Sequence, residues 1–299
     1  MFQVGDDGPG ADKALPAFEV LAPSVVTVPL VFNSPHSGAV YPPAFLAASR
    51  LDPMTLRKSE DCFVDALFGA ATDFGAPLLR AHFPRAFLDV NREPYELDPR
   101  MFDGRLPSFI NARSMRVAGG LGTIARIVGE QQEIYARKLP VSEALARIDG
   151  LYKPYHRALR QLLQDQHRRF GLAILIDCHS MPSTGAHREE GQRADIVLGD
   201  RFGTSAAPFF VEQIEEALRS RGYRVGRNRP YAGGFITEHY GNPAQSVHAI
   251  QIEVNRGLYM DERSLTKSDG FAALKADLDG MIASLIAAIG YGETRLAAE

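Results

Sequence analysis

Short apolar segments that alternate with long helical patterns are the feature of this chain that most restricts its fold. Each segment is a brief apolar or β-branched run that ends at polar residues, glycine or proline, which is typical of a buried strand. Four such strands are predicted at 30–35, 86–91, 172–178 and 247–255, and a fifth at 195–200. The alternation predicts an α/β fold whose mixed, largely parallel central sheet is covered by helices on both faces.

Three segments between these strands have apolar residues at helical spacing, namely 54–75, 142–171 and 208–223. In the second segment we expect Ser142 to cap the start, Pro154 to kink the helix and Gly171 to follow its end. No repeat, linker or strong boundary interrupts the chain. We therefore expect a flexible N-terminal lead-in over 1–20 and a single α/β domain over 21–299.

Composition narrows the classes of partner. The 299 residues have a formal charge of −3 with scattered lysines and arginines, which gives no reason to expect nucleic acid or a membrane as partner. Cys62 and Cys178 lie far apart and form no thiolate zinc motif. The N-terminus lacks the pattern of a signal peptide, and the longest apolar stretch is too short and too interrupted to span a bilayer. We expect a cytoplasmic protein with a small-molecule partner, and the oligomeric state stays open.

Polar side chains stand at the ends of four predicted strands. In open α/β sheets, ligands bind outside the carboxyl ends of the strands, so residues at these positions are candidates for a site. Together they could bring two imidazoles, several carboxylates and two arginines to one rim of the sheet. The candidates are His36, Asp89, Asn91, Arg92, Asp177, His179, Glu253 and Arg256.

These residue types indicate a particular chemistry. Two neutral histidines and a carboxylate form a catalytic zinc site that keeps one position open for water. Zinc lowers the pKa of that water to about 7, and a further carboxylate can then act as general base and general acid. Arginine matches both oxygens of a substrate carboxylate. The candidates therefore predict metal-assisted hydrolysis of an acidic amide.

Six blocks of the chain also resemble a known family. In order between about Phe32 and Glu262, the blocks are NSPHSG, SEDCFVD, DVNREP, DCHSMP, YAGGFITEHYG and EVNRGLYMDE. They are similar to the blocks of the N-formylglutamate amidohydrolases. The resemblance implies a metal-dependent deformylase that releases formate and L-glutamate from N-formyl-L-glutamate, as in histidine breakdown. It also implies a fold related to the zinc carboxypeptidases.

The resemblance implies roles for the acidic and imidazole side chains. His36 and His179 would be ligands of one Zn²⁺ per chain, although another divalent metal could take its place. Asp61 matches the acidic ligand better than its neighbour Glu60. Glu253 would be the general base, taking a proton from metal-bound water.

Further positions are expected to contact the substrate. Arg92, helped by Asn91, would hold a substrate carboxylate, and Arg256 at the end of the fourth strand is a further candidate. His239 and Tyr240 would belong to a loop over the site.

Other positions leave alternatives open. Asp177 lies two residues before His179 on an extended segment, so both side chains face the same way. It could orient the imidazole of His179 or only cap the strand. Two departures from the related patterns are Ala39, where zinc carboxypeptidases have a glutamate, and Glu238, where many relatives have a cation.

Three other functions compete with the first. The chain could be a zinc deacylase or carboxypeptidase that acts on another N-acyl amino acid. It could also be a non-catalytic dicarboxylate-binding protein that has lost the metal. A thiol-dependent amidohydrolase acting through Cys178 is the third alternative, although strand alternation turns this side chain away from the candidate site.

Overall fold

The computed structural model of the chain describes residues 15–184, 188–189 and 192–296. Its centre is a seven-stranded sheet with the order β1-β3-β2-β8-β13-β11-β12. Strand β1 pairs antiparallel with β3, β11 pairs antiparallel with β13, and the other neighbours are parallel. The strands are β1 Phe18–Leu21, β2 Leu30–Ser34, β3 Leu78–Ala81, β8 Ala173–Met181, β11 Ile196–Gly199, β12 Val225–Arg227 and β13 Val247–Asn255.

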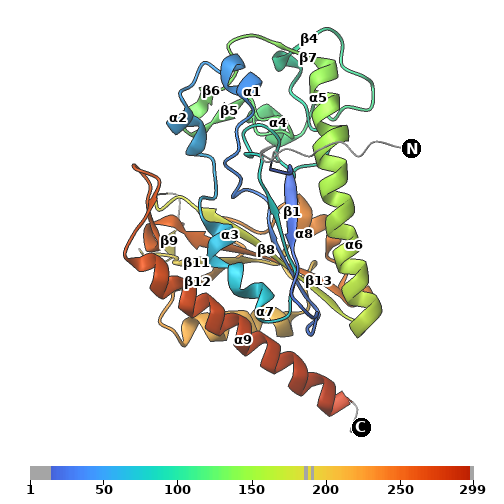
Figure 1. The fold of residues 1–299 in the computed structure, drawn as a ribbon, viewed down its shortest axis with the longest axis vertical. Helices are drawn as coiled ribbons and strands as arrows, with labels where there is room; N and C mark the ends of the chain where they lie inside the picture. Colours follow the sequence, from blue (N-terminus) through green and yellow to red (C-terminus); the bar gives the residue numbers. More distant parts are fainter. Residues whose placement is uncertain (1–14, 185–187, 190–191, 297–299) are drawn as a thin grey trace, which may run out of the picture.

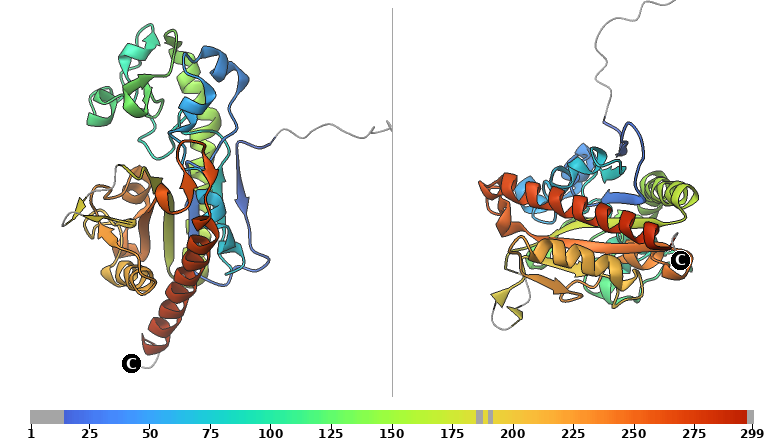
Figure 2. Two further views of the ribbon diagram at one scale, coloured as in Figure 1. Left: turned by 90° about the vertical axis from the view of Figure 1, so that its left-hand side faces the viewer. Right: turned by 90° about the horizontal axis from the view of Figure 1, so that it is seen from below.

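Helices cover both faces of this sheet (Figures 1 and 2). They are α1 Pro43–Ala48, α2 Pro53–Arg57, α3 Val64–Leu67, α4 Met115–Ala118, α5 Val141–Arg147, α6 Lys153–Phe170, α7 Pro208–Arg219, α8 Phe235–Tyr240 and α9 Gly270–Leu296. The 3₁₀ turns are Gly69–Thr72, Pro99–Met101, Gly129–Gln131, Pro243–Gln245 and Arg256–Leu258, and Ile148–Tyr152 is a π-helical turn. The short strands are β4 Phe102–Asp103, β5 Ile127–Val128, β6 Gln132–Glu133, β7 Leu139–Pro140, β9 Arg188–Glu189, β10 Gln192–Arg193, β14 Met260–Asp261 and β15 Thr266–Lys267.

Alternation along the strands divides the core into two apolar layers. Ile174, Ile176 and Cys178 of β8 pack in the layer that contains α3, α7 and α9. Leu175 of β8 packs in the opposite layer with α5, α6 and α8. Asp177 and His179 follow the same alternation as Leu175, so β8 carries two polar side chains on this second face. The rim of the sheet on this face lies next to the segment with α4, β5 and β6, in the upper part of Figure 1.

The predicted fold class is confirmed, and so are the strands at 30–34, 173–181, 196–199 and 247–255. The strand predicted at 86–91 is wrong, because this segment forms turns and the two places beside β2 in the sheet are taken by β3 and β8. Its alternation has another origin. Leu88 and Val90 are buried in the core, while Asp89 turns to the candidate site and its N–H donates to Thr123 O.

The helical predictions are partly confirmed. Gly171 ends α6 in the left-handed conformation, with φ 67°. Ser142 is not the cap, because α5 begins at Val141 with Pro140 in the capping position. Near Pro154 the helix is irregular, because α5 continues without a break into the π-helical turn Ile148–Tyr152 and then into α6. The predicted helix 54–75 is broken, because Phe63 adopts φ 64° between α2 and α3.

The two ends of the chain add two observations. Part of the expected lead-in lies outside the described residues, but its last residues begin β1, so they are held in the sheet by β3. No helix in the described part of the chain combines the length and apolarity needed to cross a membrane.

Candidate active site

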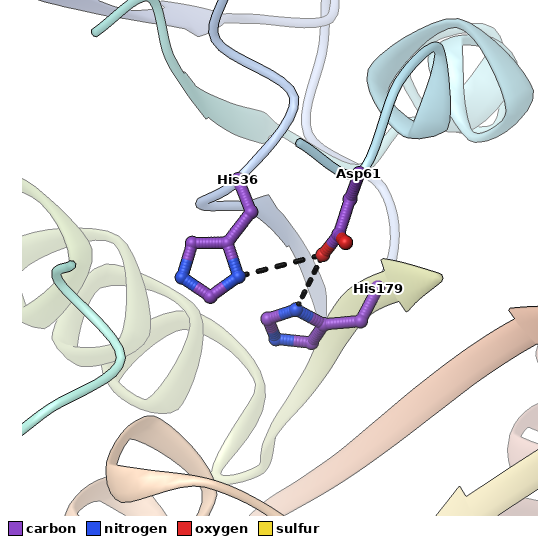
Figure 3. Close-up of side chains that lie close together, drawn as sticks. All are labelled: His36, Asp61 and His179. Carbon is purple, nitrogen blue, oxygen red and sulfur yellow. Dashed lines mark hydrogen bonds and ion pairs between the residues drawn. The ribbon is translucent and has the colours of Figure 1, made fainter. Parts of the chain in front are cut away.

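Three buried side chains from three separate segments meet at the rim of the sheet (Figure 3). His36 follows β2, Asp61 lies between α2 and α3, and His179 belongs to β8. Asp61 Oδ2 lies 3.4 Å from His36 Nδ1 and 3.0 Å from His179 Nδ1. One ligand atom from each of the three lies within 4.8 Å of the others. The backbone fixes part of this arrangement, because Asp61 N donates to His36 O at 2.9 Å.

The far nitrogen of each histidine faces a carboxylate. His36 Nε2 lies 2.7 Å from Asp89 Oδ1, and His179 Nε2 lies 3.0 Å from Asp177 Oδ2. A carboxylate at this position fixes the ring orientation and keeps the proton on Nε2, so that Nδ1 can bind a metal. Of the two possibilities for Asp177, the geometry therefore favours orientation of the imidazole.

The residues present fit a metal ion. His36 Nδ1 is buried and, within the described residues, has no hydrogen-bond partner, which leaves an acceptor facing the other two side chains. Two imidazoles and one carboxylate are a donor set that zinc accepts in catalytic sites. Burial opposes the charge on Asp61, but the adjacent imidazoles of His179 and His36 hold the pKa of this carboxyl well below its usual range. Asp61 is thus available as an anionic ligand.

Arg256 supports Asp61. Its Nη2 donates to Asp61 Oδ1 at 3.1 Å, its Nε to Ser180 Oγ at 3.1 Å and its Nη1 to Lys58 O at 3.0 Å. These contacts leave Asp61 Oδ2 for the histidines. Arg256 also lines the cavity described below, so its expected contact with substrate stays a prediction.

Glu60 is turned away from the group. It accepts hydrogen bonds from Tyr41 Oη at 2.7 Å and from Arg57 Nε at 3.2 Å. The structure therefore brings Asp61, and not Glu60, to the two histidines.

Glu253 lies beside His179 on the neighbouring strand, where the two residues are register partners. Its Oε1 accepts a hydrogen bond from Gln251 Nε2 at 2.8 Å, and Gln251 Oε1 accepts one from Gly234 N at 2.8 Å. Burial raises the pKa of Glu253 to about 7, although the nearby His179 works in the opposite direction. A carboxyl group with this pKa can both take up and release a proton near neutral pH.

A cavity of about 600 Å³ opens onto these residues. His36, His179 and Glu253 line it, together with Asn91 and Arg92. Arg92 Nε donates to Leu121 O at 2.9 Å and Nη1 to Asn91 O at 3.0 Å, which leaves Nη2 without a hydrogen bond among the described residues. Asn91 Nδ2 lies 3.1 Å from His179 Nε2. Asn91 and Arg92 therefore lie in the wall of the cavity, within reach of a bound substrate.

The structure does not bring His239 and Tyr240 to this cavity. They belong to α8, and Tyr240 Oη lies 2.8 Å from His156 Nδ1 behind the cavity wall. His239 stacks on Phe235 with ring centroids 4.9 Å apart. The expectation that they cover the site is corrected, because the helical turn of α8 directs both side chains away from it.

Several lining residues were missed in the sequence. Arg85 pairs with Asp89 at 2.8 Å, and its spacing of four residues before Asp89 was the available signal. Gln251 shares a face of β13 with Glu253, and Arg116 comes from a segment without a recognisable pattern.

Cys178 faces the apolar core on the opposite side of β8, and burial raises the pKa of its thiol well above the usual range. A thiolate mechanism therefore has no support in the structure.

Comparisons with known proteins point to one family. A family model described as N-formylglutamate amidohydrolase matches residues 28–260. N-formylglutamate deformylase from Pseudomonas aeruginosa is 29% identical over 284 residues, which cover 93% of this chain and 99% of that protein. N-formylglutamate deformylase from Pseudomonas putida is 29% identical over 238 residues, with coverage of 79% and 83%.

A solved structure gives the same relation. The crystal structure of N-formylglutamate amidohydrolase from Ralstonia eutropha JMP134 superposes with a TM-score of 0.84 at 38% identity, and the match covers 92% of this chain and 98% of that one. The family model spans most of the present chain. The chain therefore belongs to the N-formylglutamate amidohydrolase family.

Proposed function

We propose that this chain is a metal-dependent amidohydrolase that converts N-formyl-L-glutamate to formate and L-glutamate, a reaction that belongs to histidine breakdown. Family membership and the names of the three relatives support the substrate. The observation that carries the metal-dependent mechanism is the His36–Asp61–His179 group, in which both Nδ1 atoms face Asp61 while a carboxylate faces each Nε2.

His36, Asp61 and His179 would hold the ion, which we infer to be Zn²⁺, although another divalent metal fits the same donors. A bound ion would supply Lewis acidity for the attack of water on the formyl carbonyl. Asp89 and Asp177 hold the two imidazoles in the required tautomer. Each of these carboxylates is buried, so their orientation is fixed before substrate arrives.

Glu253 moves the proton. It takes a proton from the attacking water and delivers it to the amide nitrogen as the C–N bond breaks. The water oxygen leaves in formate, and both protons of the water end on the nitrogen, so glutamate leaves with its amine as an ammonium group. A pKa of about 7 suits both halves of this cycle. Gln251 holds the carboxylate in place through its 2.8 Å hydrogen bond.

Arg92 would bind one substrate carboxylate through its free nitrogen. Asn91 anchors the segment that carries Arg92, because its Oδ1 accepts a hydrogen bond from Ile236 N at 2.8 Å. The preceding residue, Val90, is fully buried. The guanidinium is therefore presented on a rigid support, which favours specific binding of a planar carboxylate.

The test is formate release from N-formyl-L-glutamate by chelator-stripped protein, with and without one equivalent of zinc. We expect release only after metal is restored. Metal binding without formate would reject the substrate, and release from fully stripped protein would reject the metal.

A variant of Glu253 separates the role of the general base from that of the metal ligands. Glu253→Gln should bind one equivalent of zinc but lose about 10²- to 10⁴-fold in kcat, because the proton carrier is gone. Glu212→Gln, an exposed change on α7, is the matched control. Full activity of Glu253→Gln would reject the role of Glu253.

A further inference from the structure

The lining of the active-site cavity has more basic than acidic side chains. The basic ones are Lys58, Arg85, Arg92, Arg116 and Arg256. The lining carboxylates are Asp89 and Glu253. A cavity with such an excess of cations attracts anions and concentrates them near the site. The question is which cations are free to bind them.

Two of the arginines already have carboxylate partners. Arg85 Nη2 donates to Asp89 Oδ2 at 2.8 Å, and Arg256 Nη2 donates to Asp61 Oδ1 at 3.1 Å. Lys58 belongs to the loop before Asp61, and its carbonyl accepts from Arg256 Nη1. It therefore lies at the metal end of the cavity, where the formyl group must be placed.

Arg116 has the least committed guanidinium of the four arginines. It lies on α4, which is capped by Ser114 and anchored by the buried side chain of Val117. Among the described residues its guanidinium donates no hydrogen bond. One carboxylate lies within ion-pair distance, with Arg116 Nη1 3.9 Å from Glu96 Oε2, which is too long for a hydrogen bond.

Arg116 and Arg92 are joined through one residue. Leu121 N donates to Arg116 O at 2.8 Å, and Leu121 O accepts from Arg92 Nε at 2.9 Å. Burial lowers the pKa of Arg92; the charge of Asp89 opposes this shift, while the charges of Arg85 and Arg116 add to it. Both guanidiniums line the same cavity and repel each other, and a ligand with two carboxylates would offset that repulsion.

We propose that Arg116 binds the side-chain carboxylate of the substrate while Arg92 binds the α-carboxylate, so that Arg116 sets the preference for acidic N-acyl amino acids. This inference rests on the proposed function. It assigns the second cation that a dicarboxylate requires, and it separates this residue from Arg85 and Arg256, which support the metal group.

The experiment compares N-formyl-L-glutamate with N-formyl-L-glutamine, an isostere that has a neutral side chain and keeps the α-carboxylate. For Arg116→Met we expect the ratio of kcat/KM for the two substrates to fall about 10- to 100-fold, because a charge-assisted hydrogen bond is lost. The loss should appear in KM for the acidic substrate and be much smaller for the neutral one. Arg113→Met, an exposed change three residues earlier that does not line the cavity, is the matched control.

Three outcomes would overturn the inference. The first is that Arg116→Met leaves the ratio of kcat/KM for the two substrates unchanged. The second is that Lys58→Met lowers this ratio and Arg116→Met does not. The third is that the wild type shows no preference for the acidic substrate. If the wild type releases formate from neither substrate, the proposed function fails separately. Calorimetric titration with L-glutamate and L-glutamine then decides, because the inference requires Arg116→Met to lose glutamate affinity selectively and is rejected otherwise.

Discussion

The carboxylate behind His179 offers a sharp test of the metal group. Asp177 Oδ2 lies 3.0 Å from His179 Nε2, and Asp177 Oδ1 accepts from Asn33 Nδ2 at 2.7 Å. The orientation of Asn33 is fixed, because its Oδ1 accepts from Tyr155 Oη at 2.6 Å. In Asp177→Asn the new oxygen must therefore face Asn33. The new NH₂ group must face His179 Nε2.

This amide would force the wrong tautomer. Asn91 Nδ2 already lies 3.1 Å from His179 Nε2, and its orientation is fixed because Asn91 Oδ1 accepts from Ile236 N. With two donors aimed at Nε2, the ring is most stable when Nε2 carries a lone pair and Nδ1 carries the proton. A protonated Nδ1 donates to Asp61 and cannot bind a metal.

The expected cost is a loss of about 10- to 100-fold in metal affinity, the range measured when such a partner is removed. This corresponds to about 1.4–2.7 kcal/mol. Competition for zinc with a chromophoric chelator measures it directly. Asp200→Asn is the matched control, because Asp200 is also buried and accepts from Asn228 Nδ2 at 2.7 Å but lies outside the cavity lining. Zinc affinity within 2-fold of wild type, in a folded Asp177→Asn protein, would refute this reasoning.

Three further predictions concern pH and packing. kcat/KM should fall on the acid side with an apparent pKa at or below about 7, because protonated Glu253 is no base and a bound cation lowers its pKa; a profile flat to pH 5 would count against it. Gly234→Ala would place its Cβ 2.4 Å from Asn91 Nδ2 and Oδ1, and it should lower kcat/KM by about 10²-fold. Gly226→Ala, whose Cβ would lie 3.6 Å from the nearest atom, should leave kcat/KM unchanged. Burial lowers the pKa of His156 to about 4. The folded state therefore favours the neutral imidazole, and this contribution to stability is complete above the unfolded pKa of about 6.5 and is lost as the pH falls toward 4. Between pH 7 and pH 5, the free energy of unfolding measured in urea should therefore fall by about 2 kcal/mol less for His156→Gln than for the wild type. Equal decreases in the two proteins would contradict this assignment.

Part of the candidate site was predictable because strands deliver side chains by simple rules. β8 is buried along its whole length and β13 from His248 onward, so an imidazole or carboxylate within them is conspicuous against the aliphatic pattern. Alternation then gives the face on which His179 and Glu253 lie. His36 was predictable for a related reason, since it follows β2 at the same rim.

The loop residues could not be placed from pattern alone. Asp61 reaches the histidines because Phe63 breaks the expected helix and Asp61 N bonds to His36 O, and both features depend on tertiary packing. The segment with Asp89 imitates a strand because its apolar residues are buried in alternation. Arg256 follows β13 and lines the cavity, and its three hydrogen bonds also support Asp61 and its surroundings, which no sequence pattern indicates.

The order of the central strands explains why these separate pieces form one site. β2, β8 and β13 are consecutive neighbours and parallel, so His36, His179 and Glu253 follow one another across the rim. β8 is the shared element, because His179 faces Asp61 on the side of β2 and pairs in register with Glu253 on the side of β13. A shift of β8 by one residue would turn His179 and Asp177 into the apolar layer and bring Cys178 to the cavity. Aliphatic pairs such as Val31 with Leu175 and Ile250 with Ile176 oppose that shift. The contacts that stabilise the sheet therefore also place His179, the proposed metal ligand, beside Glu253, the proposed general base.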